Sequence, residues 1–322
     1  MLSSLGVRYE HRAFSGHAHV DANTYPCRMI RRHPLISYFV LAYAISWLIW
    51  APLWLPAFGI STLLKIPYHH AFGALGPIAA AFLVSGMETG WSGISDLLRR
   101  MVLWRGRLTW VVVACLAPVA LFALAMAAAR LGGGETLSTA WIGRSHEFPE
   151  FSAIGFFTYN IVSFGFGEET GWRGFALPRL QARHSALVSS LLLTIGWTIW
   201  HTPLFFYQPG FTGMNAAGIA AWVFSLVTAS VLLTWLYNGS RGSILVVAIF
   251  HAAIDVVFTS ANSSSVAVNA AGALITVWGV IVVITSGHGY LSRVGKVVRQ
   301  DHGSEITGFV THREHESRPW SR

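Results

Sequence analysis

The chain has 322 residues, of which 53% are hydrophobic and only 11% are charged, with mean hydropathy +0.52 and net charge +8. Soluble globular domains carry about 25% charged residues, so a surface that faces water on all sides is excluded. The composition predicts an all-α polytopic membrane protein. The positive charge does not indicate nucleic acid, because the basic residues lie in short loops between apolar segments.

Apolar stretches recur along the whole chain, and crossing a bilayer takes about 20 residues at a rise of about 1.5 Å each. We expect eight transmembrane helices, at 35–55, 69–87, 109–130, 151–169, 186–207, 216–236, 243–260 and 267–286. They form one transmembrane domain, 34–286, between a polar tail, 1–33, and a basic tail, 287–322, both expected to be flexible. Residues 92–107 fit either an ordinary basic loop, which we favour, or an amphipathic interfacial helix.

Basic residues alternate between the predicted loops, lying before span one and after spans two, four, six (Arg241 alone) and eight, and being rare elsewhere. This bias predicts that both termini are cytoplasmic. We expect no cleavable signal peptide, because residues 1–33 lack an apolar core. Short loops and the lack of an organelle signal favour a bacterial cytoplasmic membrane. The two cysteines, Cys27 and Cys115, predict neither a disulfide framework nor a metal motif.

The first chemical motif is a glutamate pair at the end of the fourth apolar stretch. An ionisable group at bilayer depth costs about 3 kcal/mol on insertion scales, so such groups are expected only where they face the protein interior and have a function there. On a helix Glu169 and Arg173 share a face, whereas Glu168 points about 100° away. We therefore expect one structural and one chemical carboxylate. The alternative is a polar cluster that only solvates a helix end.

Two histidine motifs follow in later apolar stretches. His201 precedes Pro203, which should bend the helix near the histidine and expose carbonyl groups. His251 and Asp255 are four residues apart on one helix face, a spacing by which helices also hold zinc. Taken singly, each histidine also fits a packed, hydrogen-bonded residue that stitches helices together. Trp197, one turn before His201, fits a packing or lipid-facing aromatic residue.

Together the motifs supply the parts that hydrolysis inside a membrane needs: a carboxylate base, two imidazoles and a further oxygen ligand. They resemble the CAAX-protease and bacteriocin-processing family of intramembrane proteases, also called the Abi or CPBP family. Its pattern is EExxxR, FxxxH and HxxxN or HxxxD on successive transmembrane helices. The matching residues, all within about 150–260, are Glu168-Glu169-x-x-x-Arg173, Trp197-x-x-x-His201 and His251-x-x-x-Asp255.

The resemblance implies a role for each residue. Glu168 resembles the catalytic glutamate, and His201 resembles its partner, which polarises water or holds a metal. His251 and Asp255 match the pair that binds metal or lines the oxyanion site, and Glu169 and Arg173 match residues that orient the site. The implied enzyme is a CAAX-type intramembrane endopeptidase, expected to be a metalloprotease. Its implied zinc ligands are His201, His251, Asp255 and Glu168.

Two positions depart from the family pattern. Trp197 replaces Phe, which we expect to matter little. Asp255 stands where Asn is common, and an ionised Asp cannot donate a hydrogen bond to an oxyanion. If Asp255 has the oxyanion role, burial should keep it neutral.

The expected partners are membrane lipids and a membrane-associated protein or peptide, including a prenylated CAAX-type tail. Two other functions remain open from the sequence: a non-proteolytic bacteriocin self-immunity or scaffold protein, and a proton-coupled transporter. The full set of ionisable residues disfavours a degenerate scaffold. The absence of internal symmetry disfavours the transporter.

Overall fold

The structure is a computed structural model that describes residues 25–61, 63–104, 107–132, 143–145, 148–260, 265–299 and 307–311. Each of the eight predicted spans contains helix within these ranges. The helices of the first half are α1 (Tyr25–Arg32), α2 (Pro34–Ile49), α3 (Ala51–Trp54), η1 (Leu55–Phe58), α4 (His69–Ala74), α5 (Gly76–Thr89), α6 (Trp91–Met101) and α7 (Leu108–Leu131). Those of the second half are α8 (Ala153–Asn160), η3 (Ile161–Phe166), α9 (Gly167–Gly171), η4 (Trp172–Ala176), α10 (Leu177–Gln181), α11 (Ala186–Trp200), η5 (Thr202–Phe206), α12 (Pro209–Thr212), α13 (Ala216–Gly239), α14 (Ile244–Thr259) and α15 (Ser265–Ser286).

The helices form a bundle whose outer members are apolar enough to lie in lipid. Within the described ranges, five stretches are long and apolar enough to cross a membrane, namely Pro34–Phe58, His69–Thr89, Leu108–Leu131, Ala216–Gly239 and Val266–Ser286. The predicted class, an all-α polytopic membrane protein, is therefore confirmed, whereas the count of eight spans stays a prediction. Helices α11 and α14 have only 15 and 16 residues, fewer than the roughly 20 that span a bilayer unaided.

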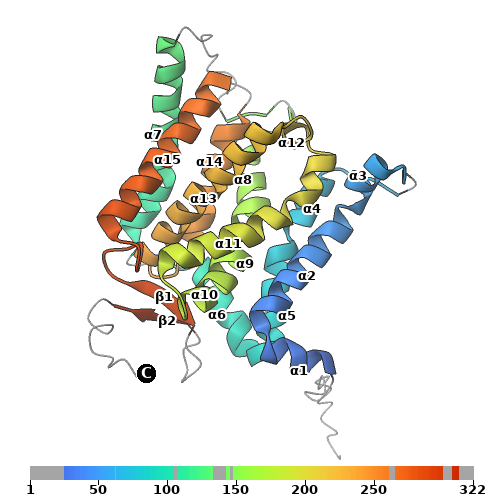
Figure 1. Cartoon of the computed structure of the whole chain (residues 1–322), viewed down its shortest axis with the longest axis vertical. Helices are drawn as coiled ribbons and strands as arrows, with labels where there is room; N and C mark the ends of the chain where they lie inside the picture. The colour runs from blue at the N-terminus through green and yellow to red at the C-terminus, as the bar shows by residue number, and fades with distance from the viewer. Residues whose placement is uncertain are drawn as a thin grey trace, which may run out of the picture.

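The basic segments gather at one end of the bundle. Figure 1 shows α1, α6, α10 and the C-terminal strands at its lower end, and α3 and α12 at its upper end. We call the lower end the basic end, because it carries Arg31, Arg99, Arg100, Arg179 and Arg299. One basic end is what the loop alternation predicts for a chain with an even number of spans.

The glutamate pair lies within a long helical segment and not at its end, contrary to the expected boundary at residue 169. Helix runs from Ala153 to Gln181 through α8, η3, α9, η4 and α10, and both η3 and η4 are π-helical. The polar cluster does not end the helix, because its charges find partners inside the bundle. Glycines allow other helices to approach: a Cβ at Gly165 would lie 2.6 Å from the Ala248 carbonyl oxygen on α14. One-turn π segments of this kind are frequent at functional sites.

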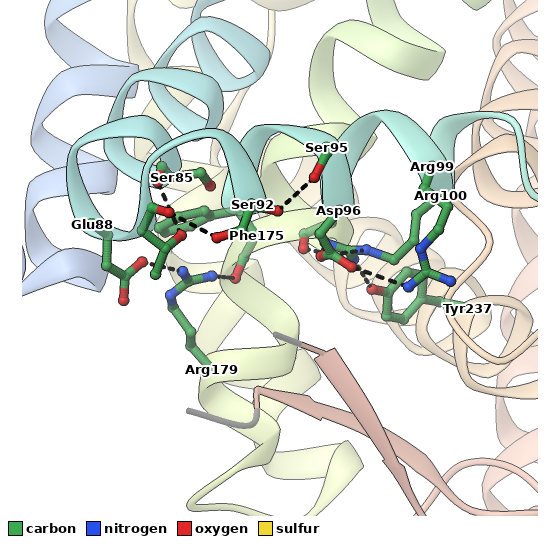
Figure 2. A network of polar contacts seen from close by, with 12 residues as sticks. Ser85, Glu88, Ser92, Ser95, Asp96, Arg99, Arg100, Phe175, Arg179 and Tyr237 are labelled. Atoms are coloured by element: carbon green, nitrogen blue, oxygen red, sulfur yellow. Dashed lines mark hydrogen bonds and ion pairs between the residues drawn. The ribbon is translucent and has the colours of Figure 1, made fainter. Parts of the chain in front are cut away.

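Helix α6 occupies the segment for which an ordinary basic loop was favoured, and that preference was wrong. Arg100 is buried, and its Nη2 lies 2.7 Å from Asp96 Oδ2 while its Nη1 donates to the Tyr237 hydroxyl at 2.6 Å. Figure 2 shows these three side chains together, with Arg179 reaching Glu88 nearby. The arginines face protein as well as solvent, so the amphipathic pattern reflects packing against the bundle.

Arg100 also binds the helix that carries the glutamates. Its Nη1 donates to the Gly174 carbonyl oxygen at 2.8 Å. The α-helical donor for that carbonyl would be residue 178, and Pro178 has no N–H. The Arg100 side chain from α6 thus replaces the hydrogen bond that Pro178 cannot donate to the Gly174 carbonyl.

The C-terminal tail is ordered where the structure describes it, which corrects the expectation of flexibility for residues 287–299. Strands β1 (Lys296–Arg299) and β2 (Thr307–Val310) form an antiparallel pair with Val297 opposite Phe309. Val297 is buried, its N–H donates to Asn238 on α13, and its carbonyl accepts from Gln181 on α10. The hairpin therefore joins α10 to α13 at the basic end. Helix α1 likewise gives structure to residues 25–32 of the N-terminal tail, and the expectation for residues 1–24 lies outside the described residues.

Candidate functional site

The three sequence motifs meet in the middle of the bundle. Glu168 and Glu169 lie on α9, Trp197 and His201 lie on α11 and just after it, and His251 lies on α14. In Figure 1, α9 lies between α5 on one side and α14 on the other, and α9 packs against both. Residues about 80 positions apart in the sequence are therefore brought into direct contact.

Glu169 is held through one carboxylate oxygen, while its Oε2 is buried without a hydrogen-bond partner among the described residues. Its Oε1 accepts from Arg173 Nη1 at 2.9 Å and from His251 Nδ1 at 2.7 Å, and both Glu169 and Arg173 are fully buried. Arg173 Nη2 also donates to Ser230 Oγ at 3.3 Å. The predicted pairing of Glu169 with Arg173 is confirmed. A buried ion pair of this geometry is costly to break, since removal of one partner leaves the other charge uncompensated.

Glu168 has a different environment although it is the next residue. Its Oε2 accepts from the indole N–H groups of Trp197 at 2.7 Å and Trp172 at 3.3 Å, and it forms no ion pair with any arginine that the structure describes. Its Oε1 accepts no hydrogen bond from the residues that the structure describes. Glu168 is 4% exposed. One carboxylate oxygen is thus fixed while the other is available to a ligand.

His201 lies where its helix ends, and not inside a continuous helix as residues 186–207 predicted. Helix α11 stops at Trp200 and continues as the tighter 3₁₀ turn η5, which contains Pro203. The regular helix is thus interrupted near the proline, while the predicted bend stays a prediction. His201 Nδ1 lies 2.7 Å from the Trp197 carbonyl oxygen. A carbonyl only accepts, so Nδ1 carries the hydrogen and Nε2 of the neutral ring keeps its lone pair.

His251 is held mainly by Glu169, although its sequence neighbour Asp255 is also close. Asp255 Oδ2 lies 3.6 Å from His251 Nε2, longer than the 2.7 Å contact between Glu169 and Nδ1. The Asp255 side chain is 30% exposed, whereas Glu169 is fully buried. The predicted proximity of His251 and Asp255 is confirmed. The contact of His251 with Glu169 on another helix could not be predicted from the i,i+4 spacing.

Sequence reasoning missed two features of the site. Trp197 appeared replaceable by Phe, but its N–H is a direct ligand of Glu168. His70 on α4 stacks on Trp50 and lies with its Nδ1 2.7 Å from the Tyr207 hydroxyl, which ties α4 to the segment that follows His201. A histidine pair, His69 and His70, at the start of an apolar stretch was the available signal for the second feature.

The residues expected to hold zinc are His201, His251, Asp255 and Glu168. Within the described residues, no group of three or more His, Cys, Asp or Glu side chains has the disposition of a metal centre. His251 Nδ1 binds Glu169 and Glu168 Oε2 binds two indoles, so the atoms of these two residues that could hold zinc are His251 Nε2 and Glu168 Oε1. No step below is derived through a metal.

The fold and these contacts define a polytopic helical membrane protein that encloses a carboxylate and histidine site. Residues 150–257 match the family described as type II CAAX prenyl endopeptidase Rce1-like. The chain is also 35% identical over 92 residues to CAAX prenyl protease 2 of Methanococcus maripaludis, which covers 27% of this chain and 34% of that protein. The chain thus matches about a third of that relative's length. The region that carries the three motifs is thus similar to the Rce1-like family, in agreement with the resemblance drawn from the motifs.

Proposed function

We propose that the chain is an intramembrane endopeptidase that hydrolyses peptide bonds in membrane-associated substrates of the prenylated CAAX type. One observation carries the proposal: Glu168, with a free carboxylate oxygen, and His201, with a free ring nitrogen, are both bound to Trp197 in the centre of the bundle. Trp197 holds Glu168 through its side chain and His201 through its carbonyl. Two acceptors around one residue are suited to capture and orient a water molecule.

The two neighbouring glutamates have different roles in the proposed reaction. Glu169 is neutralised by Arg173 and accepts from His251, so it is an orienting group. Among the described residues Glu168 forms no ion pair with a lysine or arginine, so its ionised form is a stronger base than a salt-bridged carboxylate would be. The neighbouring carboxylates thus differ in the way that the helix geometry predicts, with Glu168 as the chemical one.

The reaction follows from these assignments. A water molecule donates its hydrogens to Glu168 Oε1 and His201 Nε2, and Glu168 takes one proton as the oxygen attacks the scissile carbonyl carbon. The protonated Glu168 then gives that proton to the leaving amide nitrogen as the C–N bond breaks, which regenerates the carboxylate. His251 and Asp255 are assigned to the side of the site where the oxyanion develops, and a hydrogen bond from either requires its protonated form.

The substrate class is proposed from the family and from the location of the site. The matched relative is named a CAAX prenyl protease, and the bundle encloses the site within helices whose outer faces are apolar. A lipid-modified peptide held in the bilayer could reach such a site laterally. A bacterial cytoplasmic membrane, expected from the sequence, is part of this proposal.

The test is cleavage by the purified chain in liposomes. A farnesylated CAAX-tail peptide should lose its last three residues, the same peptide without the lipid should be cleaved poorly, and Glu168→Gln should abolish cleavage. A well-folded wild-type chain that cleaves neither peptide would contradict the proposal and favour the immunity or scaffold alternative. Proton flux that persists in Glu168→Gln, without cleavage, would favour the transporter.

Zinc, expected from the resemblance, has its own test. Metal analysis of the purified chain should give about one zinc per chain if zinc is a resident cofactor, and His201→Ala and His251→Ala should both lose it. A metal-free chain that still cleaves peptide would favour the route through Glu168 and His201 alone.

A further inference from the structure

A cavity of about 380 Å³ lies where α7, α13 and α15 meet the segment that follows α15. Figure 1 shows α7 and α15 side by side along one edge of the bundle, and the two helices pack against each other. The lining residues come from the start of α7 and the ends of α13 and α15, so the cavity lies towards the basic end. None of the motif residues of the candidate functional site lines it, and its size is that of a ligand site.

Three tryptophans in a row line this cavity. The ring centroids of Trp110 and Trp235 are 4.8 Å apart, those of Trp235 and Trp278 are 5.7 Å apart, and both pairs meet edge to face. Gly239 on α13 allows this approach, because a Cβ at that position would overlap the Trp110 ring. None of the three indole N–H groups donates to a residue that the structure describes, although a buried indole N–H usually finds an acceptor. These donors are therefore available to an acceptor from outside the chain.

The charged side chain that lines the cavity is Arg293. It is exposed, and it forms no hydrogen bond or ion pair with any residue that the structure describes. Arg107 at the start of α7 and Arg241 just after α13 add positive charge to the same segments. Asp and Glu are missing from the sequence of these segments and their surroundings, at residues 97–134, 170–254 and 256–300. The lining is thus complementary to an anion.

The cavity continues onto an exposed apolar face of α15. Ile281 lines the cavity and is itself exposed, and the exposed side chains of Val277 and Ile284 lie one turn away on the same helix face. Residues Val266–Ser286 are long and apolar enough to cross a membrane, so this face is suited to hydrocarbon. One ligand that combines an anionic group with hydrocarbon chains would satisfy both parts of the surface.

We propose that this cavity binds one phospholipid with an anionic headgroup, taken from the leaflet at the basic end. The phosphate accepts hydrogen bonds from Arg293 and from the indole N–H groups, and the hydrocarbon chains lie against Ile281 and its neighbours on α15. Basic pockets between transmembrane helices bind anionic headgroups in this way. A zwitterionic lipid offers the same phosphate but adds a cationic group, which Arg293 repels. This site is independent of peptide hydrolysis.

The test counts phospholipid on the full chain in nonionic detergent by native mass spectrometry. Phosphatidylglycerol is the anionic probe and phosphatidylcholine the zwitterionic one. One phosphatidylglycerol per chain should bind saturably, and phosphatidylcholine should bind about tenfold more weakly. Arg293→Gln should weaken the binding of phosphatidylglycerol by about tenfold, because a hydrogen bond to a charged group is lost. Arg293→Lys keeps the charge and should weaken it less.

Arg32→Gln is the matched control. Arg32 is an exposed arginine on α1, also at the basic end, and it does not line the cavity. This variant should bind phosphatidylglycerol as the wild type does. Ser286→Phe adds a ring to the cavity lining without a change of charge, and it should also weaken binding. All variants are compared at the wild-type Tm in lipid-free detergent, and the arginine variants decide the test if Ser286→Phe does not fold.

Three outcomes would overturn the proposal. Equal weakening in Arg32→Gln and Arg293→Gln would show that the net charge of the chain attracts the lipid without this cavity. Equal affinity for the two phospholipids would remove the anionic headgroup from the proposal. Displacement of phosphatidylglycerol by inorganic phosphate alone would assign the cavity to a free anion. Because none of these readouts requires cleavage, failure of the proposed function would leave the test of this site intact.

Discussion

Replacing Glu169 with Gln removes the only carboxylate that Arg173 contacts within the described residues. Both side chains are fully buried, and the pair is separated by 2.9 Å. Two unit charges about 4 Å apart attract by roughly 4 kcal/mol at an effective dielectric constant of about 20. Loss of one partner from a buried pair commonly destabilises a protein by about 3–5 kcal/mol. We expect Glu169→Gln to lower the free energy of unfolding by an amount in this range.

Glu168→Gln is the matched control, because it makes the same isosteric change one residue away. Glu168 forms no ion pair within the part of the chain that the structure describes, and the amide oxygen of Gln can still accept from the indole of Trp197. Its free energy of unfolding should therefore change by less than about 1 kcal/mol, while cleavage should be lost. The neighbouring substitutions should give opposite signatures, one in stability and one in activity.

The assay is reversible unfolding in mixed detergent micelles, followed by tryptophan fluorescence, with peptide cleavage measured on the same preparations. Equal loss of stability in the two variants would refute the assignment of Glu169 as the structural carboxylate. Full cleavage activity in Glu168→Gln, with folding intact, would refute the assignment of Glu168 as the base.

Two further predictions concern the basic end. Arg100 donates to the Gly174 carbonyl in place of the N–H that Pro178 lacks. Pro178→Ala should therefore stabilise the Arg100→Gln variant more than it stabilises the wild type, by about 1 kcal/mol. Additive effects in the double-mutant cycle would contradict this. Asn238→Ala should lower the free energy of unfolding by about 2 kcal/mol or more, because the buried side-chain oxygen of Asn238 accepts a hydrogen bond from the Val297 N–H. Hydrogen exchange at the Val297 amide should then quicken, and unchanged protection would show that the hairpin does not depend on this contact.

The sequence was most informative where the physical signal is local. Low charge and repeated apolar segments define a membrane protein without reference to packing. The i,i+4 spacing of Glu169 and Arg173 fixes their shared helix face, and the structure confirms their pairing. Pro203 indicated a disturbance of the helix near His201, but the end of the helix at Trp200, inside the predicted span 186–207, was not predicted.

Contacts between helices could not be predicted in the same way. The segment 92–107 has the composition of a basic loop, and only tertiary contacts, such as those of Arg100 with Gly174 on η4 and Tyr237 on α13, show that it is a helix packed on the bundle. The C-terminal strands are ordered because the side chains of Gln181 and Asn238 take up the backbone groups of Val297. Gln181 and Asn238 are both far from Val297 in the sequence, so no local sequence pattern predicts these contacts.

The same distinction holds for the candidate site, where the identity of the residues and the choice of their partners have different origins. By itself the sequence determined which ionisable residues lie in apolar helices, because their burial is unfavourable unless they have partners. The tertiary structure alone decided which partners they take: His251 binds Glu169 across 82 positions, and Trp197 binds Glu168 across 29. Hydrogen bonds require atoms within about 3 Å in a defined direction, and helix packing, which sets that geometry, is a property of the whole bundle.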